Sequence, residues 1–377
     1  MAVAASTEEF VPWEDPNEIP LIRSDAVTKR FGEFTAIDNV SQNIYRQEFF
    51  ALLGPSGCGK TTLMRMLAGF ETPTEGRITI DEQDMAAVSP NKRAVNMMFQ
   101  SYALFPHLSV WENIAFGLRR DKLPKDQIAA RVEEMLKLVQ LQQFARRKPH
   151  QISGGQRQRV ALARSLAKAP KLLLLDEPLG ALDKKLRQDT QFELMDIQEK
   201  TGTTFVIVTH DQEEAMTVAS RVAVMDHGEI MQVATPAKIY EQPNSVYVAD
   251  FIGDVNLIEG RVGTVDGSAE LDWAEGRGPL VGQAGSDLSK GDAAIFAIRP
   301  EKIAISTEEP EVQNRVFGKI LDIGYLGNLS TYHVELPEGP VIKCEVGNRS
   351  RLDRRDFTWD DEVWLSWSDT AGLVLPA

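Results

Sequence analysis

Residues 54–61 read Gly-Pro-Ser-Gly-Cys-Gly-Lys-Thr, which fits the phosphate-loop pattern G-x-x-x-x-G-K-[ST] without a mismatch. The apolar run Phe49–Leu53 precedes this stretch and reads as a buried strand, and residues 62–68 read as a helix that ends at Gly69. In a strand–loop–helix unit of this kind, successive backbone N–H groups surround phosphate oxygens and the helix N-terminus adds partial positive charge. The stretch therefore predicts a nucleoside triphosphate site rather than a chance glycine-rich turn.

Each side chain of the loop has an expected part in that site. Lys60 can reach the β- and γ-phosphates, and the hydroxyl of Thr61 can ligate Mg²⁺. Cys58 lies at a helix N-terminus, which favours its thiolate, but we expect it to fill space rather than to catalyse. The residues predicted to contact the nucleotide are Gly54, Pro55, Ser56, Gly57, Cys58, Gly59, Lys60, Thr61 and Thr62.

A second motif follows the most apolar strand of the chain, Leu172–Leu175. Asp176 and Glu177 close this strand, and the carboxyl ends of parallel strands are where ligands bind in open α/β sheets. Asp176 is then placed to hold Mg²⁺, and Glu177 to polarise the attacking water as a general base. The alternative is a pair of carboxylates that merely caps the strand.

A third motif, Ser153-Gly154-Gly155-Gln156, precedes a basic helix. Ser153 and Gln156 fit the capping box S-x-x-Q, which accounts for the motif by local structure alone. The two glycines also leave the N–H groups of the first turn accessible to an anion. From the residues themselves, both interpretations stay open.

Composition limits the classes of protein. The 377 residues include 41 basic and 55 acidic side chains, a net charge of −14, which argues against non-specific nucleic-acid binding. Two cysteines exclude a disulfide framework and fit a reducing cytosol. We find no signal peptide and no stretch that could span a bilayer, so membrane association is expected to go through a partner.

The pattern along the chain predicts three regions. Residues 1–20 are acidic, contain three prolines and are expected to form a mobile extension. In residues 21–255, apolar strand-like runs alternate with helical patterns, which indicates an α/β domain with a parallel sheet. In residues 256–377, glycine turns separate short strand-like runs, which indicates a small all-β barrel.

In their order, these motifs together with Gly180-Ala181-Leu182-Asp183 resemble the ATP-binding subunit of an ABC transporter. The resemblance implies a head-to-tail homodimer, in which each ATP lies between the phosphate loop of one subunit and the signature turn of the other. Ser153, Gly154, Gly155 and Gln156 would then hold the γ-phosphate bound to the partner.

The same resemblance implies roles for single residues. Gln100 resembles the glutamine that ligates Mg²⁺ and senses the transmembrane partner, and His210 resembles the switch histidine at the γ-phosphate. Asp183 resembles the aspartate that acts across the dimer, and Phe31 the aromatic residue that stacks on adenine. Without the family, these would be read as a surface amide, a capping or core histidine, a helix N-cap and a core phenylalanine. Residues 101–107, which follow Gln100, correspond to the groove that receives a cytoplasmic helix of the membrane subunit.

The C-terminal part carries a further resemblance. Phe251-Ile252-Gly253 and Arg299-Pro300-Glu301 resemble the oligonucleotide-fold regulatory domain of importer ATPases. Residues 96–100 and 324–334 are most similar to polyamine importers, which implies transport of putrescine or spermidine. The implied partners are two membrane permease subunits and, indirectly, a periplasmic binding protein, at the cytoplasmic face of the bacterial inner membrane, with no nucleic acid.

Two alternatives stay open. The same machine could import another solute, such as a sugar, iron or sulfate. A soluble ABC ATPase acting on DNA or ribosomes is the rival from another class, but the chain has neither a long coiled coil between the motifs nor a second ATPase cassette. A nucleic-acid-binding barrel is disfavoured because residues 256–377 carry 12 bases against 21 acids.

Overall fold

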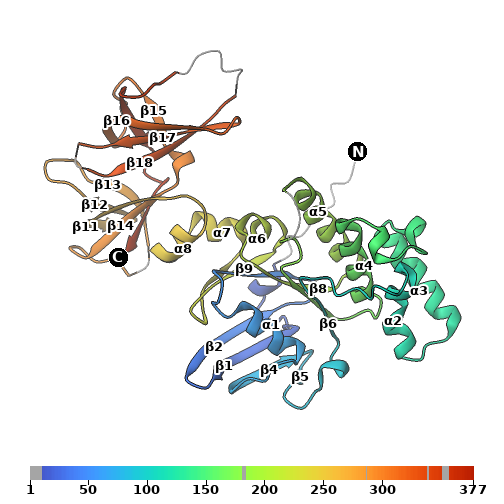
Figure 1. Cartoon of the computed structure of the whole chain (residues 1–377). Helices are drawn as coiled ribbons and strands as arrows, with labels where there is room; N and C mark the ends of the chain where they lie inside the picture. Colours follow the sequence, from blue (N-terminus) through green and yellow to red (C-terminus); the bar gives the residue numbers. More distant parts are fainter. Residues whose placement is uncertain (1–10, 181–183, 286, 338, 350–355) are drawn as a thin grey trace, which may run out of the picture. The chain divides into compact units, whose positions relative to one another are not determined.

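A computed structural model describes residues 11–180, 184–285, 287–337, 339–349 and 356–377 (Figure 1). The chain divides into two compact units, with the division between Pro236 and Ala237. Each unit has its own hydrophobic core. No described helix combines the length and the apolar composition that a membrane crossing requires.

The first unit contains two β-sheets. An antiparallel sheet has the order β2-β1-β4-β5, and a six-stranded sheet has the order β10-β9-β3-β8-β7-β6. In the larger sheet β3, β6, β7, β8 and β9 run parallel, as the apolar runs predicted, and β10 pairs antiparallel with β9. The strands are β1 (Ile22–Phe31), β2 (Phe34–Ile44), β3 (Phe49–Leu53), β4 (Glu75–Ile80), β5 (Gln83–Asp84), β6 (Val95–Met98), β7 (Leu172–Asp176), β8 (Thr204–Thr209), β9 (Arg221–Asp226) and β10 (Glu229–Ala234).

Helices flank the larger sheet of this unit (Figure 1). The helix predicted at residues 62–68 and the basic helix predicted after Ser153–Gln156 are present as α1 and α4. Helix α2 was not predicted, and Ser109 begins it with a complete capping box to Glu112. The helices of the first unit are α1 (Lys60–Ala68), α2 (Val110–Arg120), α3 (Lys125–Leu138), α4 (Gly154–Leu166), α5 (Lys184–Thr201) and α6 (Gln212–Val218).

The central strands of the larger sheet are covered on both faces. Every residue of β3 and β8 is buried, and so are the four leucines of β7. Because parallel strands point the same way, their carboxyl ends share one edge of the sheet. The phosphate loop after β3, Asp176 at the end of β7 and Thr209 at the end of β8 therefore meet along that edge.

The second unit begins with two short helices, α7 (Pro236–Glu241) and α8 (Val246–Phe251), and is otherwise all-β. Five strands close a barrel in the order β11-β12-β13-β20-β14. Five others form a separate sheet in the order β15-β19-β16-β17-β18. The strands are β11 (Asn256–Asp266), β12 (Ser268–Asp272), β13 (Leu280–Ala284), β14 (Ala293–Ile298), β15 (Ala304–Ser306), β16 (Asn314–Tyr325), β17 (Leu329–Glu335), β18 (Val341–Gly347), β19 (Glu362–Trp367) and β20 (Leu373–Pro376).

The prediction of one small barrel was incomplete, because this unit holds a barrel and a sheet. The short strand-like runs expected in residues 256–377 are present from β14 onward, whereas the glycine-rich stretch before them read as turns but contains β11 to β13. Barrel and sheet share one hydrophobic core, in which Phe296 of β14 and Trp367 of β19 have ring centroids 5.9 Å apart. The barrel closes only because β20, near the C-terminus, pairs with both β13 and β14.

Arg299 explains why residues 237–255 belong to the second unit. Its buried guanidinium donates hydrogen bonds to the carbonyl oxygens of Ala249 (2.9 Å) and Asp254 (3.0 Å) and lies 4.3 Å from the ring centroid of Tyr240. Arg299 directly follows β14, and its side chain contacts both α7 and the end of α8. The predicted boundary at residue 255 falls after this helical segment, whereas the compact units divide before it.

Part of the predicted N-terminal extension has a defined place. Residues 1–10 lie outside the described residues, but Pro12–Glu14 form a 3-10 turn. The Trp13 ring lies 4.8 Å from the guanidinium of Arg221, which is buried against Glu48. The segment around Trp13 therefore contacts the first unit.

Candidate functional site

Two glycines of the phosphate loop are required by this chain's own packing. A Cβ at Gly54 would lie 2.3 Å from the carbonyl oxygen of Met225, and a Cβ at Gly59 would lie 2.5 Å from that of Ala36. Gly59 also has φ +107°, a conformation that side-chain-bearing residues rarely adopt. Gly57 has φ +87°, yet a Cβ there would meet nothing within 4 Å, so its exposed backbone faces open space.

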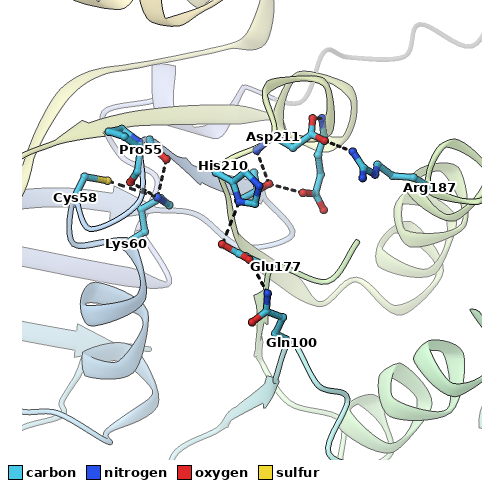
Figure 2. Close-up of polar contacts among 11 residues, drawn as sticks. Pro55, Cys58, Lys60, Gln100, Glu177, Arg187, His210 and Asp211 are labelled. Atoms are coloured by element: carbon cyan, nitrogen blue, oxygen red, sulfur yellow. Dashed lines mark hydrogen bonds and ion pairs between the residues drawn. The ribbon is translucent and has the colours of Figure 1, made fainter. Parts of the chain in front are cut away.

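Lys60 begins α1, and its ammonium group is buried among neutral groups. Its Nζ donates to the carbonyl oxygens of Gly54 (2.7 Å) and Pro55 (2.8 Å) and lies 3.6 Å from Sγ of Cys58 (Figure 2). Among the described residues, no carboxylate forms an ion pair with Lys60. The loop therefore concentrates positive charge at a helix N-terminus without an acidic partner, and an anionic phosphate chain fits such a site. Thr61 and Thr62 follow in the first turn, both half-buried.

Glu177 lies at the centre of a polar cluster drawn from three strand ends. Gln100, two residues beyond β6, donates through Nε2 to Glu177 Oε2 at 2.8 Å. His210, directly after β8, places Nδ1 3.2 Å from Glu177 Oε1 (Figure 2). Residues separated by 77 and 33 positions thus hold the two oxygens of one carboxylate, so the structure brings the three predicted catalytic residues together.

The backbone of Glu177 is also constrained. Its φ is +43°, in the left-handed region, and its N–H donates to the carbonyl oxygen of Val208 at 3.0 Å. A non-glycine residue in this region costs about 1–3 kcal/mol and is typical of functional sites. Asp176, one position earlier, has a raised pKa because of its burial and the neighbouring charge of Glu177, while Arg65 acts in the opposite direction.

The turn that carries His210 contains functional candidates that the sequence reasoning missed. The Thr209 hydroxyl hydrogen-bonds the Glu214 carboxylate and accepts the Asp211 N–H at 2.9 Å. Asp211 caps α6 by accepting the Glu214 N–H at 3.1 Å, and it forms an ion pair with Arg187 of α5. The pattern Asp211-x-x-Glu214 could have drawn attention to Glu214 as a capping box, but its side chain turns to Thr209 instead.

The signature turn forms the capping box that its sequence predicted. Ser153 Oγ accepts the Gln156 N–H at 3.2 Å, and Gln156 Oε1 accepts the Ser153 N–H at 3.0 Å, so the bonds of this motif are local. A Cβ at Gly154 or Gly155 would come no closer than 3.8 Å or 3.5 Å to this chain. In contrast to Gly54 and Gly59, nothing in the chain's own packing forbids side chains at these two positions.

The remaining predicted site residues have separate places. Phe31 ends β1 with 47% of its surface exposed, which excludes a core role, and Lys29 lies over its ring at 4.7 Å. Asp183 lies outside the described residues. The structure therefore leaves part of the Phe31 side chain exposed, where a planar group could stack on it.

Residues 101–107 form a turn held by Arg164 of α4. Arg164 donates to the carbonyl oxygens of Tyr102 (2.9 Å) and Ala103 (2.7 Å), both of which have positive φ. Around this turn, aromatic side chains remain partly exposed: Phe99 at 40%, Phe116 at 41% and Phe70 at 54%. The rings of Phe70 and Phe99 have centroids 6.2 Å apart, and those of Phe105 and Phe116 have centroids 4.4 Å apart.

Known proteins resemble the chain over most of its length. Residues 37–180 match the family described as ABC transporter, and residues 296–375 match the TOBE domain. The putrescine transport ATP-binding protein PotG of Escherichia coli (strain K12) is 53% identical over 359 residues, which cover 94% of this chain and 95% of that protein. The spermidine/putrescine import ATP-binding protein PotA of Nitrosomonas eutropha is 47% identical, covering 93% and 97%.

A solved structure extends the comparison to the ATP-binding fold. A dimeric, post-hydrolysis state of the ATP-binding cassette MJ0796 bound to ADP and Pi is 33% identical, with a TM-score of 0.51, and covers 57% of this chain and 98% of that one. The predicted fold class, an ABC ATPase domain followed by an all-β domain, is confirmed by these matches. The chain belongs to the ATP-binding proteins of the ABC transporter family and carries a C-terminal TOBE domain.

Proposed function

We propose that this chain is the ATP-hydrolysing subunit of an ABC importer for polyamines, putrescine or spermidine. The observation that carries the hydrolytic part is the Gln100–Glu177–His210 cluster at the sheet edge that also holds the phosphate loop. The full-length similarity to PotG and PotA supports the substrate class. The C-terminal TOBE domain supports the importer architecture.

The chemistry follows from how the groups are held. When ATP binds, the Lys60 ammonium group gives up its hydrogen bonds to the loop carbonyl oxygens and binds the β- and γ-phosphates instead. The N–H groups of residues 57–61 surround the phosphate chain. Glu177 accepts the proton of the attacking water, because its two oxygens are fixed by Gln100 and His210 and aimed by its strained backbone. His210 then lies beside the γ-phosphate, where its imidazole stabilises developing charge. Phe31 stacks on the adenine ring.

A magnesium ion fits the same edge of the sheet. Thr61, Gln100 and Asp176 would hold it, since hydroxyl, amide and carboxylate oxygens are the ligands that Mg²⁺ prefers. When bound, the ion would neutralise negative charge on the β- and γ-phosphates. Burial and the nearby charge of Glu177 raise the pKa of Asp176, so its ionised form is disfavoured, and a bound cation would stabilise it.

The signature turn supports a head-to-tail homodimer. Gly154 and Gly155 lack side chains although this chain leaves room for them, which is explained if a phosphate from a second subunit approaches their N–H groups. Ser153→Arg should then bind ATP through its own loop but fail to close the dimer. A mixed dimer with Lys60→Ala should keep one intact composite site, whereas loss of binding in Ser153→Arg alone would show that the turn acts in cis.

The exposed phenylalanines near residues 101–107 are the proposed contact for the permease. A short amphipathic helix buries its apolar face in such a surface, and Gln100 links the surface to Glu177. This contact would hold the chain at the cytoplasmic face of the inner membrane. Two permease subunits would pair with the two ATPase subunits.

Two experiments test the proposal. Lys60→Ala should lose ATP binding, measured by titration of the purified protein; unchanged affinity would contradict the phosphate-loop assignment. Deletion of the gene should abolish uptake of labelled putrescine or spermidine, with Glu177→Gln failing to restore it. If uptake of both polyamines is unchanged while uptake of a sugar or iron falls, the substrate class is wrong and the importer function stands.

A further inference from the structure

Glu214 is a buried carboxyl group for which the proposed hydrolysis has no assigned part. It belongs to α6, with 2% of its surface exposed, and it follows His210 by four positions. One of its oxygens, Oε2, is bonded to the Thr209 hydroxyl. The other, Oε1, is buried and has no hydrogen-bond partner among the described residues.

The bonds of Glu214 reach both neighbours of His210. Its side chain binds Thr209, the residue before His210, and its N–H binds the side chain of Asp211, the residue after it. Thr209 and Asp211 are also joined to each other at 2.9 Å. The side chain of His210 takes no part in these bonds and contacts Glu177 instead.

Charges around Glu214 make its protonation consequential. Burial raises its pKa to about 7, the charges of Asp211 and Glu177 act in the same direction, and the Thr209 hydrogen bond and Arg187 act against them. The neutral acid fits the site as it stands. An ionised Glu214 would need donors for both oxygens, and Arg187, now bound to Asp211, is a cation whose charge already acts on Glu214.

We propose that Glu214 is a positioning residue that holds the turn of residues 209–211, and that its neutral form keeps His210 against Glu177. Ionisation of Glu214 draws Arg187 from Asp211, loosens the α6 cap and weakens the His210–Glu177 contact. The inference rests on the proposed ATP hydrolysis. It predicts that the rate of this hydrolysis depends on pH through the protonation of Glu214.

The test compares pH profiles of isosteric variants. Glu214→Gln is permanently neutral and keeps an acceptor for Thr209, and Glu213→Gln is the matched control at an exposed position one residue away. The ratio of wild-type to Glu214→Gln kcat should fall at least fivefold from pH 6 to pH 8.5, with a midpoint near 7, because all other titrating groups are common to both proteins. The corresponding ratio for Glu213→Gln should stay constant. A constant ratio for Glu214→Gln overturns the proposal.

A second variant separates positioning from folding. Glu214→Ala removes the acceptor and should lower kcat about tenfold or more, while KM for ATP changes less than about threefold because the phosphate loop is untouched. Recovery of activity in Glu214→Gln shows that the acceptor, not bulk, is required. Equal losses in both variants at pH 6 would contradict this, and should Glu214→Ala not fold, the Gln profile alone decides.

A spectroscopic readout keeps the inference separate from the proposed function. The His210 imidazole resonance, assigned by its loss in His210→Gln, should depend on pH in the same way in the wild type and in Glu213→Gln but differently in Glu214→Gln, because residue 214 cannot ionise there. If the wild type hydrolyses ATP no faster than Lys60→Ala, the proposed function fails, and the imidazole resonance still judges the inference. An identical pH dependence of this resonance in all three proteins would overturn the inference.

Discussion

Two buried asparagines of the second unit and two buried polar side chains of the first unit differ in how completely they are hydrogen-bonded. In the second unit, Asn256 donates to and accepts from the backbone of Lys343, and Asn314 does the same for Val281, at 2.7–2.9 Å. In the first unit, Glu214 keeps one oxygen without a partner, and both polar atoms of the buried Gln158 lack one. Fully bonded side chains such as Asn256 and Asn314 stabilise the packing around them, whereas incompletely bonded ones retain capacity for a ligand, a proton or a second conformation.

This comparison predicts two kinds of failure. Substitutions at the polar site around Glu177 should lower activity, whereas substitutions at fully bonded, tightly packed or buried titrating positions of either unit should change stability. The expected effects are ordered from the largest to the smallest.

Glu177→Gln should lower the rate of ATP hydrolysis by about 10²–10⁴-fold, since the amide keeps the shape and loses the base. ATP binding should be retained, so the variant should accumulate as an ATP-bound dimer on a sizing column. The thermal midpoint of unfolding should change little. Normal turnover would show that another group is the base.

Arg299→Ala should destabilise the second unit by about 3–4 kcal/mol, because the carbonyls at the end of α8 lose their donor inside the structure. Arg261→Ala is the matched control, since that exposed arginine bonds only the Gly291 carbonyl at 3.1 Å. Urea unfolding measures both. Equal stability of the two variants would show that the buried hydrogen bonds of Arg299 do not stabilise the second unit.

Gly59→Ala should destabilise the first unit by about 2–3 kcal/mol, because the new Cβ overlaps the Ala36 carbonyl and requires φ +107°. Gly154→Ala should leave stability within about 1 kcal/mol, since its Cβ meets nothing closer than 3.8 Å. Thermal unfolding of both proteins checks this. A large loss in Gly154→Ala would mean that the signature glycines serve packing within one chain.

The pH dependence of stability should carry a small contribution from Glu214. Its folded pKa of about 7 lies above the ordinary value of 4.5, so the folded state binds more protons than the unfolded state between these values. Stability therefore falls as pH rises through this window, by about 1 kcal/mol between pH 6 and pH 8 from this group. The free energies of unfolding of the wild type and Glu214→Gln should be measured in urea at each pH, and their difference should fall over this range. A difference that does not change with pH would contradict the burial of a titrating acid.

Local motifs were predictable because the interactions that form them lie within a few residues. The phosphate loop, the Ser153–Gln156 capping box and the parallel strands with continuous apolar runs are of this kind. Where local signals misled, glycine was the cause. Gly260, Gly263 and Gly267 read as turns, yet they lie in or beside the barrel strands β11 and β12.

The contacts between side chains at the edge of the sheet could not be predicted from local sequence patterns. Motifs indicated Gln100, Glu177 and His210 one at a time, and the contacts that hold the Glu177 carboxylate span 77 and 33 residues. Arg299 stood out as a family motif, but its role at the end of α8 became visible only with the fold. Glu214 had no signal beyond a capping pattern, because its raised pKa depends on burial.

The sequence by itself therefore determined the nucleotide-binding strand–loop–helix unit, the alternation of strands and helices, and the all-β character of the C-terminal part. Backbone propensity, apolar periodicity and glycine conformation act over a few residues, so they can be read from the sequence without the fold. The tertiary structure alone decided which polar groups share the Glu177 carboxylate, how β20 closes the barrel, and which carboxyl is buried enough to stay neutral. Those properties arise from packing between distant segments, where desolvation and long-range pairing set the energies.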